Sequence, residues 1–134
     1  MEVNNVFGPV DIAISGLRAQ HKRMEVISSN VANARTTDAG KGEPYRRLEA
    51  IFKADGDDIG GVSLDEIVKD MSDFHRILDP GNPNADEQGY VLMPNVSLPV
   101  EMINLNIAMR AYQANAAILK RYQRMVETAL ELLR

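Results

Sequence analysis

The sequence predicts an α+β fold, with a long helix at each end of the chain and a small antiparallel β-rich domain between them. Apolar residues recur in heptads at both ends, whereas the middle shows strand-like alternation and many turn formers. Heptads of this kind form the a and d positions of a coiled coil, so we expect the two terminal helices to pair. The predicted parts are residues 1–42 (helix and connector), 43–97 (β-rich domain) and 98–134 (C-terminal helix).

The N-terminal helix is expected to begin after Pro9, with Asp11 near its positive end, and to run to about Ala34. Residues 33–44 are rich in turn formers and end it. Gln20 interrupts its apolar row, which consists of Val10, Ala13, Leu17, Met24, Ile27, Val31 and Ala34.

The middle of the chain reads as strands and turns, with one ambiguous segment. Residues 45–52 alternate as a half-exposed strand does, a glycine-rich acidic turn follows at 54–61, and Tyr90–Met93 is a short strand after a loop at 79–89. Between these, apolar residues of segment 62–78 recur at a helical spacing, and Ser63 with Glu66 has the spacing of a capping box. Periodicity alone therefore predicts a helix there.

The C-terminal helix is expected to begin near Pro99, with Glu101 in its first turn, and to continue to Arg134. Gln123 interrupts its heptad row, which consists of Met102, Leu105, Met109, Tyr112, Ala116, Leu119, Val126, Leu130 and Leu133. A second apolar row consists of Ile103, Ile107, Ala111, Ala114, Ile118, Met125 and Leu132. A helix that is apolar on two sides needs two sets of partners, so neighbouring subunits or a membrane surface are implied.

Composition disfavours several classes of function. The chain has no Cys, which excludes disulfides and thiolate chemistry, and with no Trp and few other aromatic residues it lacks the usual lining of a ligand pocket. A net charge of -4 and a pI near 5.1 argue against nucleic acid as a partner. No catalytic motif is present. We expect no enzyme activity, cofactor or small-molecule substrate, and interpret basic clusters such as Lys120, Arg121 and Arg124 as solvated faces or partners of nearby Glu.

Residues 55–66 resemble a calcium-binding loop at its first, third, sixth and twelfth positions. Ile59 occupies the fifth position, where a ligand oxygen is required, so we interpret the segment as an acidic turn between strands. His21 and His75 each lack a second histidine at metal-ligand spacing. The sequence therefore predicts no metal site.

Motifs near both ends resemble those of one protein family. Residues 27–37 (ISSNVANARTT), preceded by 13–17 (AISGL), are similar to the N-terminal signature of bacterial flagellar axial proteins, the rod and hook group. Residues 100–115 (VEMINLNIAMRAYQAN) resemble the second signature of that group, and 44–47 (PYRR) and 79–96 resemble its small proximal-rod members. The resemblance implies a β-rich middle, and on that ground we expect residues 62–70 to form a strand.

The resemblance implies a structural subunit of the flagellar proximal rod, which polymerises through its terminal helices and transmits motor torque across the periplasm. The implied partners are further copies, the rod proteins FlgB, FlgF and FlgG, the basal adaptor FliE and the flagellar type III export apparatus. The first residues lack a signal-peptide pattern, so we expect export without a cleaved signal peptide.

The residues expected at subunit contacts are Leu17, Met24, Ile27, Asn30, Val31, Asn33, Met102, Leu105, Met109, Tyr112, Gln113, Asn115, Leu119, Val126 and Leu130. Amides such as Asn30 in these positions would fix the register of the helices. Two alternatives stay open. The same residues would also suit an ordinary intramolecular helical hairpin, in which Asn30 and Asn33 cap a helix end. The chain as a whole would also suit a generic helical-hairpin adaptor or a membrane-surface protein.

Overall fold

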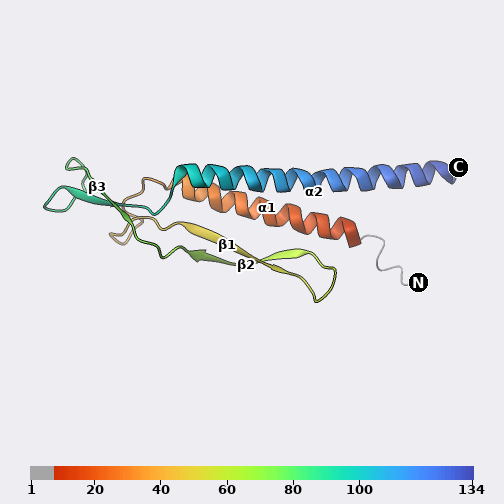
Figure 1. The fold of residues 1–134 in the computed structure, drawn as a ribbon, viewed down its shortest axis with the longest axis horizontal. Helices are drawn as coiled ribbons and strands as arrows, with labels where there is room; N and C mark the ends of the chain where they lie inside the picture. Colours follow the sequence, from red (N-terminus) through yellow and green to blue (C-terminus); the bar gives the residue numbers. More distant parts are fainter. Residues whose placement is uncertain (1–7) are drawn as a thin grey trace.

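The computed structural model describes residues 8–134, which form two helices and two antiparallel hairpins (Figure 1). In chain order the elements are α1 (Gly8–Ala32), β1 (Leu48–Ala54), β2 (Val62–Lys69), β3 (His75–Leu78), β4 (Tyr90–Met93) and α2 (Leu98–Leu132). Strand β1 pairs with β2, and β3 pairs with β4. The predicted α+β class, with terminal helices around a β-rich middle, is confirmed.

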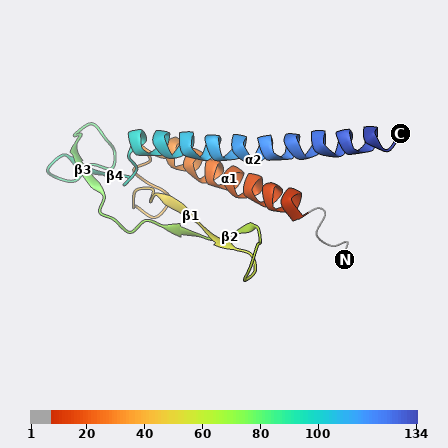
Figure 2. The same ribbon diagram turned by 45° about the vertical axis from the view of Figure 1, so that its right-hand side comes forward.

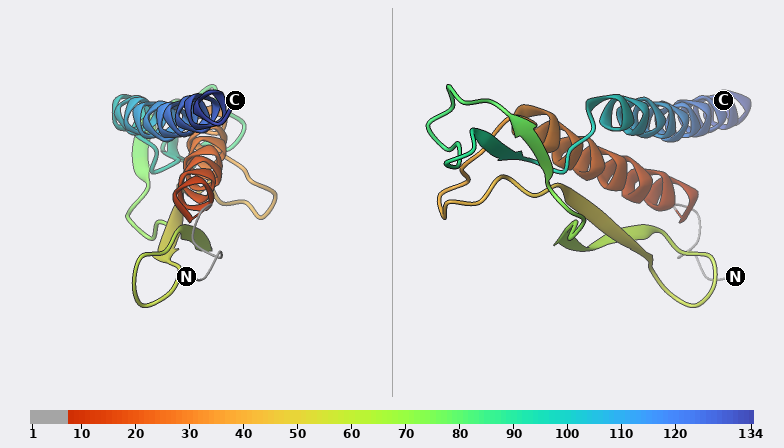
Figure 3. Two further views of the ribbon diagram at one scale, coloured as in Figure 1. Left: turned by 90° about the vertical axis from the view of Figure 1, so that its right-hand side faces the viewer. Right: turned by 60° about the vertical axis from the view of Figure 1, so that its left-hand side comes forward.

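Helix α1 is the central layer of a three-layer stack. Seen end-on, α2, α1 and the β1–β2 hairpin follow one another in that order (Figure 3). Helix α1 is therefore covered on two sides, and the side chains that it buries are Ala13, Ala19, Val26, Ile27 and Asn30. The β1–β2 hairpin is fixed to α1 at Val62, whose N–H donates to the Ser15 hydroxyl at 3.0 Å. The core of this thin molecule thus runs along α1.

The β3–β4 hairpin lies beyond the first turn of α2, at one end of an elongated molecule (Figure 2). The C-terminus of α2 lies at the opposite end (Figure 1). Helix α2 has 35 residues and α1 has 25, and the two run antiparallel, so the last turns of α2 extend past α1. The two ends of the molecule consequently expose different kinds of surface.

The two helices meet along a row that is displaced from the predicted one at the start of α2. Glu101 and Ala108 are 0% exposed, whereas their heptad-row neighbours Met102 and Met109 are 50% and 43% exposed. Small side chains allow this close approach, since a Cβ added to Gly16 of α1 would lie 2.7 Å from Asn115 Oδ1. The helices are thus paired as expected, while a continuous coiled-coil seam between them stays a prediction.

The ambiguous segment contains strands, so the resemblance predicted it correctly and the helical period was misleading. Strand β2 coincides with the expected 62–70 to within one residue, and β3 lies in the remainder of the segment. Pairing with β1 decides the conformation, and Ser63 donates its hydroxyl to Asp55 Oδ1 at 2.6 Å instead of capping a helix. Strand β1 begins at Leu48, later than expected, because Tyr45–Arg47 bond to other elements.

Candidate functional site

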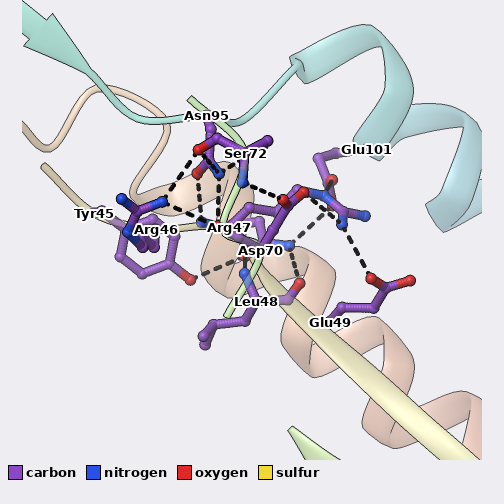
Figure 4. Close-up of polar contacts among 10 residues, drawn as sticks. Tyr45, Arg46, Arg47, Leu48, Glu49, Asp70, Ser72, Asn95 and Glu101 are labelled. Atoms are coloured by element: carbon purple, nitrogen blue, oxygen red, sulfur yellow. Dashed lines mark hydrogen bonds and ion pairs between the residues drawn. The ribbon is translucent and has the colours of Figure 1, made fainter. Parts of the chain in front are cut away.

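A buried polar network joins α1, the segment before β1 and the start of α2 (Figure 4). Asn30 is fully buried, and its Nδ2 donates to the Leu48 carbonyl at 2.9 Å and to Glu101 Oε2 at 3.2 Å. Its Oδ1 accepts from the Leu48 N–H at 2.8 Å and from the Tyr45 hydroxyl at 3.0 Å. One amide therefore holds three segments in register, because leaving any of these buried groups unbonded would be costly.

Arg47 and Glu101 form the ionic centre of this network. Arg47 Nε donates to Glu101 Oε1 at 2.5 Å, and the Glu101 side chain is 0% exposed. Burial alone would lower the pKa of Arg47, but the hydrogen bond and charge of Glu101, followed by the charges of Glu49 and Asp70, raise that pKa above its ordinary value. Arg47 thus stays protonated and supplies the counter-charge that a buried carboxylate requires.

A second part of the network ties both hairpins to the same point. Asn95 accepts the Arg47 backbone N–H on its Oδ1 at 2.8 Å and donates to the Asp70 carbonyl at 2.9 Å. The Arg46 guanidinium donates to the Ser72 carbonyl at 3.1 Å and stacks 4.2 Å from the centroid of the Phe74 ring. The segments before β1, between β2 and β3, and before α2 therefore converge on these side chains (Figure 4).

The network includes residues that sequence reasoning did not select. Glu101 was interpreted as a helix-start residue and Asn95 as part of a family-like segment, whereas Arg46 and Arg47 were interpreted as a basic cluster that is solvated or paired with nearby Glu. A signal existed, because residues 44–47 contain an Arg pair and Glu101 is the only acidic residue of segment 100–115. Pairing them, however, requires knowing that residues 47 and 101 meet in space.

The predicted contact residues fall into interior and surface groups. Asn33 of this set donates its Nδ2 to the Ser29 carbonyl at 2.9 Å and so caps the end of α1, as the intramolecular alternative proposed. The buried members are Ile27 and Asn30, and the half-buried members are Leu17, Met24, Val31, Asn33, Leu105, Asn115 and Leu119. The exposed members are Met102, Met109, Tyr112, Gln113, Val126 and Leu130, all on α2.

Helix α2 carries more exposed large apolar side chains than any other element in residues 8–134. Its side toward α1 is covered, whereas most large side chains of the second apolar row are at least half exposed. The large side chains of that row are Ile103 (60%), Ile107 (50%), Ile118 (49%), Met125 (60%) and Leu132 (82%). Such a row of apolar side chains, open to water along a helix, is typical of an interaction surface.

The acidic turn at 55–61 connects β1 to β2. The Asp55 N–H donates to the Gly61 carbonyl at 2.9 Å, and Glu66 lies away from the turn, opposite Ile51 in the β1–β2 ladder. Across residues 8–134, no three His, Asp or Glu side chains converge as metal ligands would. Over the same residues, neither helix combines the length and the apolar character needed to span a bilayer.

Comparisons with known proteins identify the family. Residues 11–39 match the family described as "Flagella basal body rod protein", and residues 87–132 match "Flagellar basal body rod FlgEFG protein C-terminal". The flagellar basal-body rod protein FlgC of Salmonella typhimurium is 40% identical over 135 residues, which cover 98% of each chain. This chain belongs to the FlgC family of flagellar basal-body rod proteins.

More distant FlgC proteins match over similar lengths. The Agrobacterium fabrum protein is 39% identical over 127 residues, covering 92% of this chain and 91% of the relative. The Borreliella burgdorferi protein is 36% identical over 148 residues, covering 96% and 97%. The match to FlgC thus extends over nearly the whole chain, and it confirms the resemblance to rod proteins found in the sequence.

Proposed function

We propose that this chain is a non-enzymatic structural subunit of the bacterial flagellar basal-body rod, in its proximal segment. The observation that carries the proposal is the end-to-end similarity to proteins named flagellar basal-body rod protein FlgC. This similarity favours a rod subunit over a generic helical adaptor or a membrane-surface protein. No specific observation favours either of those two alternatives.

Assembly is driven by covering the exposed apolar side of α2 with neighbouring subunits. Removing apolar surface from water contributes about 25 cal/mol per Å², and part of this gain offsets the freedom that the subunits lose on association. The contacts join different surfaces of successive subunits, and such heterologous contacts propagate into a helical polymer. The exposed members of the predicted contact set, such as Met102, Met109 and Gln113, touch neighbours directly, while buried members such as Ile27 and Asn30 position them.

The polar network gives each subunit the stiffness that an axle requires. Through Asn30, Arg47 and Glu101, both helices and the start of β1 are bonded at one point. Torque applied to the helices of one subunit is then passed through a fixed joint to the hairpins, and through many parallel apolar contacts to the next subunit. Neighbours in this assembly are further copies, FlgB, FlgF, FlgG and FliE, and the chain reaches the periplasm through the flagellar type III export apparatus.

Deletion and complementation in the source bacterium test this function. Loss of the gene should abolish swimming in soft agar, and a tagged copy should restore swimming and copurify with basal bodies. Normal swimming without the gene, or basal bodies that lack the tagged chain in swimming cells, would contradict the proposal.

A further inference from the structure

The two ends of the elongated molecule carry exposed apolar side chains with opposite surrounding charge. One end is the hairpin tip, residues 75–93, which comprises β3, β4 and the loop between them. The other is the helix tail, residues 120–134 of the α2 region, which extends past α1 (Figure 1). The subunit function proposed above gives the helix tail contacts with neighbours, for example through Val126 and Leu130, but it does not say which surface of a neighbour meets the tail, and it gives the hairpin tip no contact.

The hairpin tip is apolar and acidic. Ile77, Leu78 and Leu92 are 48%, 59% and 48% exposed. The tip contains three carboxylates, Asp79, Asp86 and Glu87, against one arginine, Arg76. Arg76 forms an ion pair with Asp86 at 3.1 Å and stacks over the Tyr90 ring. Asp79 and Glu87 therefore have no ion pair within residues 8–134. The tip therefore offers leucine side chains beside uncompensated negative charge.

The helix tail is apolar and basic, although the whole chain has a net charge of -4. It has four basic side chains, Lys120, Arg121, Arg124 and Arg134, against two glutamates, and none of the four has an ion pair within the described part of the chain. Arg121, Met125 and Leu132 are spaced by four and seven residues, which places them on one stripe of the helix. This stripe combines exposed apolar side chains with positive charge.

We propose that the hairpin tip of one copy docks on the helix tail of the next copy. The proposal rests on the proposed function, because it specifies which surfaces of a rod subunit meet. Leucines of the tip would pack against Met125 and Leu132, and Asp79 and Glu87 would lie opposite Arg121 and Arg124. Since the two surfaces lie at opposite ends of one molecule, the contact is heterologous and leaves a free tip and a free tail to continue the assembly.

Cysteine crosslinking tests the contact cleanly, because the chain contains no cysteine of its own. Purified Leu78→Cys and Met125→Cys variants, each carrying a different tag, are mixed at high concentration and oxidised. We expect a disulfide-linked pair that contains both tags, and a ladder of multimers when one chain carries both cysteines. The matched control replaces Leu78→Cys by Asp57→Cys in the exposed β1–β2 turn and should give little mixed product. Mixed product no greater than in the control would overturn the proposal.

Charge exchange tests the electrostatic part. Arg121→Glu with Arg124→Glu in the Met125→Cys chain should lower the yield of mixed product several-fold, and Asp79→Arg with Glu87→Arg in the Leu78→Cys chain should restore it. Arg18→Glu, a reversal on the exposed side of α1, is the control and should change the yield little. An equal loss in the control, or no restoration, would contradict the assigned charge pairing.

Crosslinking in basal bodies separates this inference from the proposed function. The chain with both cysteines should appear in purified basal bodies and form a disulfide between two copies there. Its presence in basal bodies with a crosslink only to another rod protein, or with none, would overturn the tip-to-tail contact while leaving the rod function intact. Its absence from basal bodies of swimming cells would contradict the function itself.

Discussion

At the scale of single residues, the fold depends on a few buried polar side chains rather than on a large apolar core. Asn30 and Glu101 are 0% exposed, yet each of their side chains bonds within the network. A buried ion pair adds little net stability compared with apolar residues, but losing one partner leaves a charge without compensation. The network therefore specifies how the segments meet and is sensitive to single changes.

Glu101→Ala should lower the free energy of unfolding by about 3 kcal/mol, because Arg47 would keep its charge without its closest partner. Chemical denaturation followed by circular dichroism measures this. The control is Glu25→Ala, which removes a carboxylate paired with Lys22 on an exposed helix face and should cost little. Equal free energies of unfolding for the two variants would show that the contact between Glu101 and Arg47 does not stabilise the fold.

Acid should destabilise the protein below about pH 4, the ordinary range of aspartate. Hydrogen bonds from the Tyr90 and Gln88 N–H groups and from Arg76 lower the pKa of Asp86, and the Ser72 N–H and hydroxyl, with Arg47 and Arg46, lower that of Asp70. A carboxyl whose pKa is lower in the folded state stabilises that state above its unfolded pKa, and this contribution is lost as the pH falls through the folded value.

Thermal unfolding between pH 7 and pH 3 measures this effect. Asp86→Asn should lower stability at pH 7 and flatten the pH dependence, because the side chain can no longer gain a proton. Asp57→Asn, in the exposed turn, is the control. A pH profile unchanged by Asp86→Asn would rule out a contribution from this group.

At the scale of elements, α1 is packed between α2 and the β1–β2 hairpin, and this position limits the size of the side chains that α1 can carry. Gly16 faces the Asn115 side chain, and the Asn115 Nδ2 itself donates a hydrogen bond to the Ala111 carbonyl at 3.0 Å. Space at this crossing is therefore limited by a side chain that is already bonded.

Gly16→Val should destabilise the protein by about 2 kcal/mol, because the added methyl groups overpack the crossing of α1 and α2. Asn115→Ala in the same chain should recover part of this loss, since it removes the atoms that a Cβ would approach. The double-mutant cycle, measured by urea denaturation, checks the coupling. Additive effects of the two substitutions would contradict the close contact.

The helix tail should exchange its amide hydrogens faster than the rest of α2 in the dilute protein. A helical segment in water depends on packing for its stability, and every residue from Gln123 to Arg134 is exposed. Hydrogen–deuterium exchange with peptide resolution measures this, and residues 98–115, which lie along α1, provide the internal reference. Equal protection along the whole of α2 would contradict the expectation.

At the scale of the whole molecule, α2 divides its apolar residues between the fold and the assembly. Ile107→Glu changes a side chain that is 50% exposed, so it should leave the stability of the monomer nearly unchanged and yet block incorporation into basal bodies and swimming. Leu119→Asp changes a half-buried side chain on the row toward α1 and should lower stability as well.

Thermal unfolding of the purified variants and blotting of isolated basal bodies provide the two measurements. Glu131→Gln, an exposed polar change on the helix tail, is the control for both. Swimming cells that carry Ile107→Glu at normal levels would show that the exposed apolar side of α2 is not an assembly surface.

Local patterns in the sequence were sufficient for the helices, their approximate ends and the loop at 79–89. Pro9 and Pro99 mark the first turns, and the turn formers after Asn33 end α1, because these residues act on the backbone next to them. The segment 62–78 was not decided by its own pattern. Its apolar spacing fits a helix, but pairing with β1 and β4 supplies the backbone hydrogen bonds that make it two strands.

The sequence by itself thus determined the helix–strand–helix order, the two apolar rows of α2 and, through its motifs, the resemblance to flagellar rod proteins. Only the tertiary structure decided which row of α2 faces α1, because the close approach of Gly16 to Asn115 selects Glu101 and Ala108 over Met102 and Met109. It also decided the pairing of Arg47 with Glu101. Heptad spacing records which residues share a face, whereas the partner of that face depends on contacts between residues far apart in the chain.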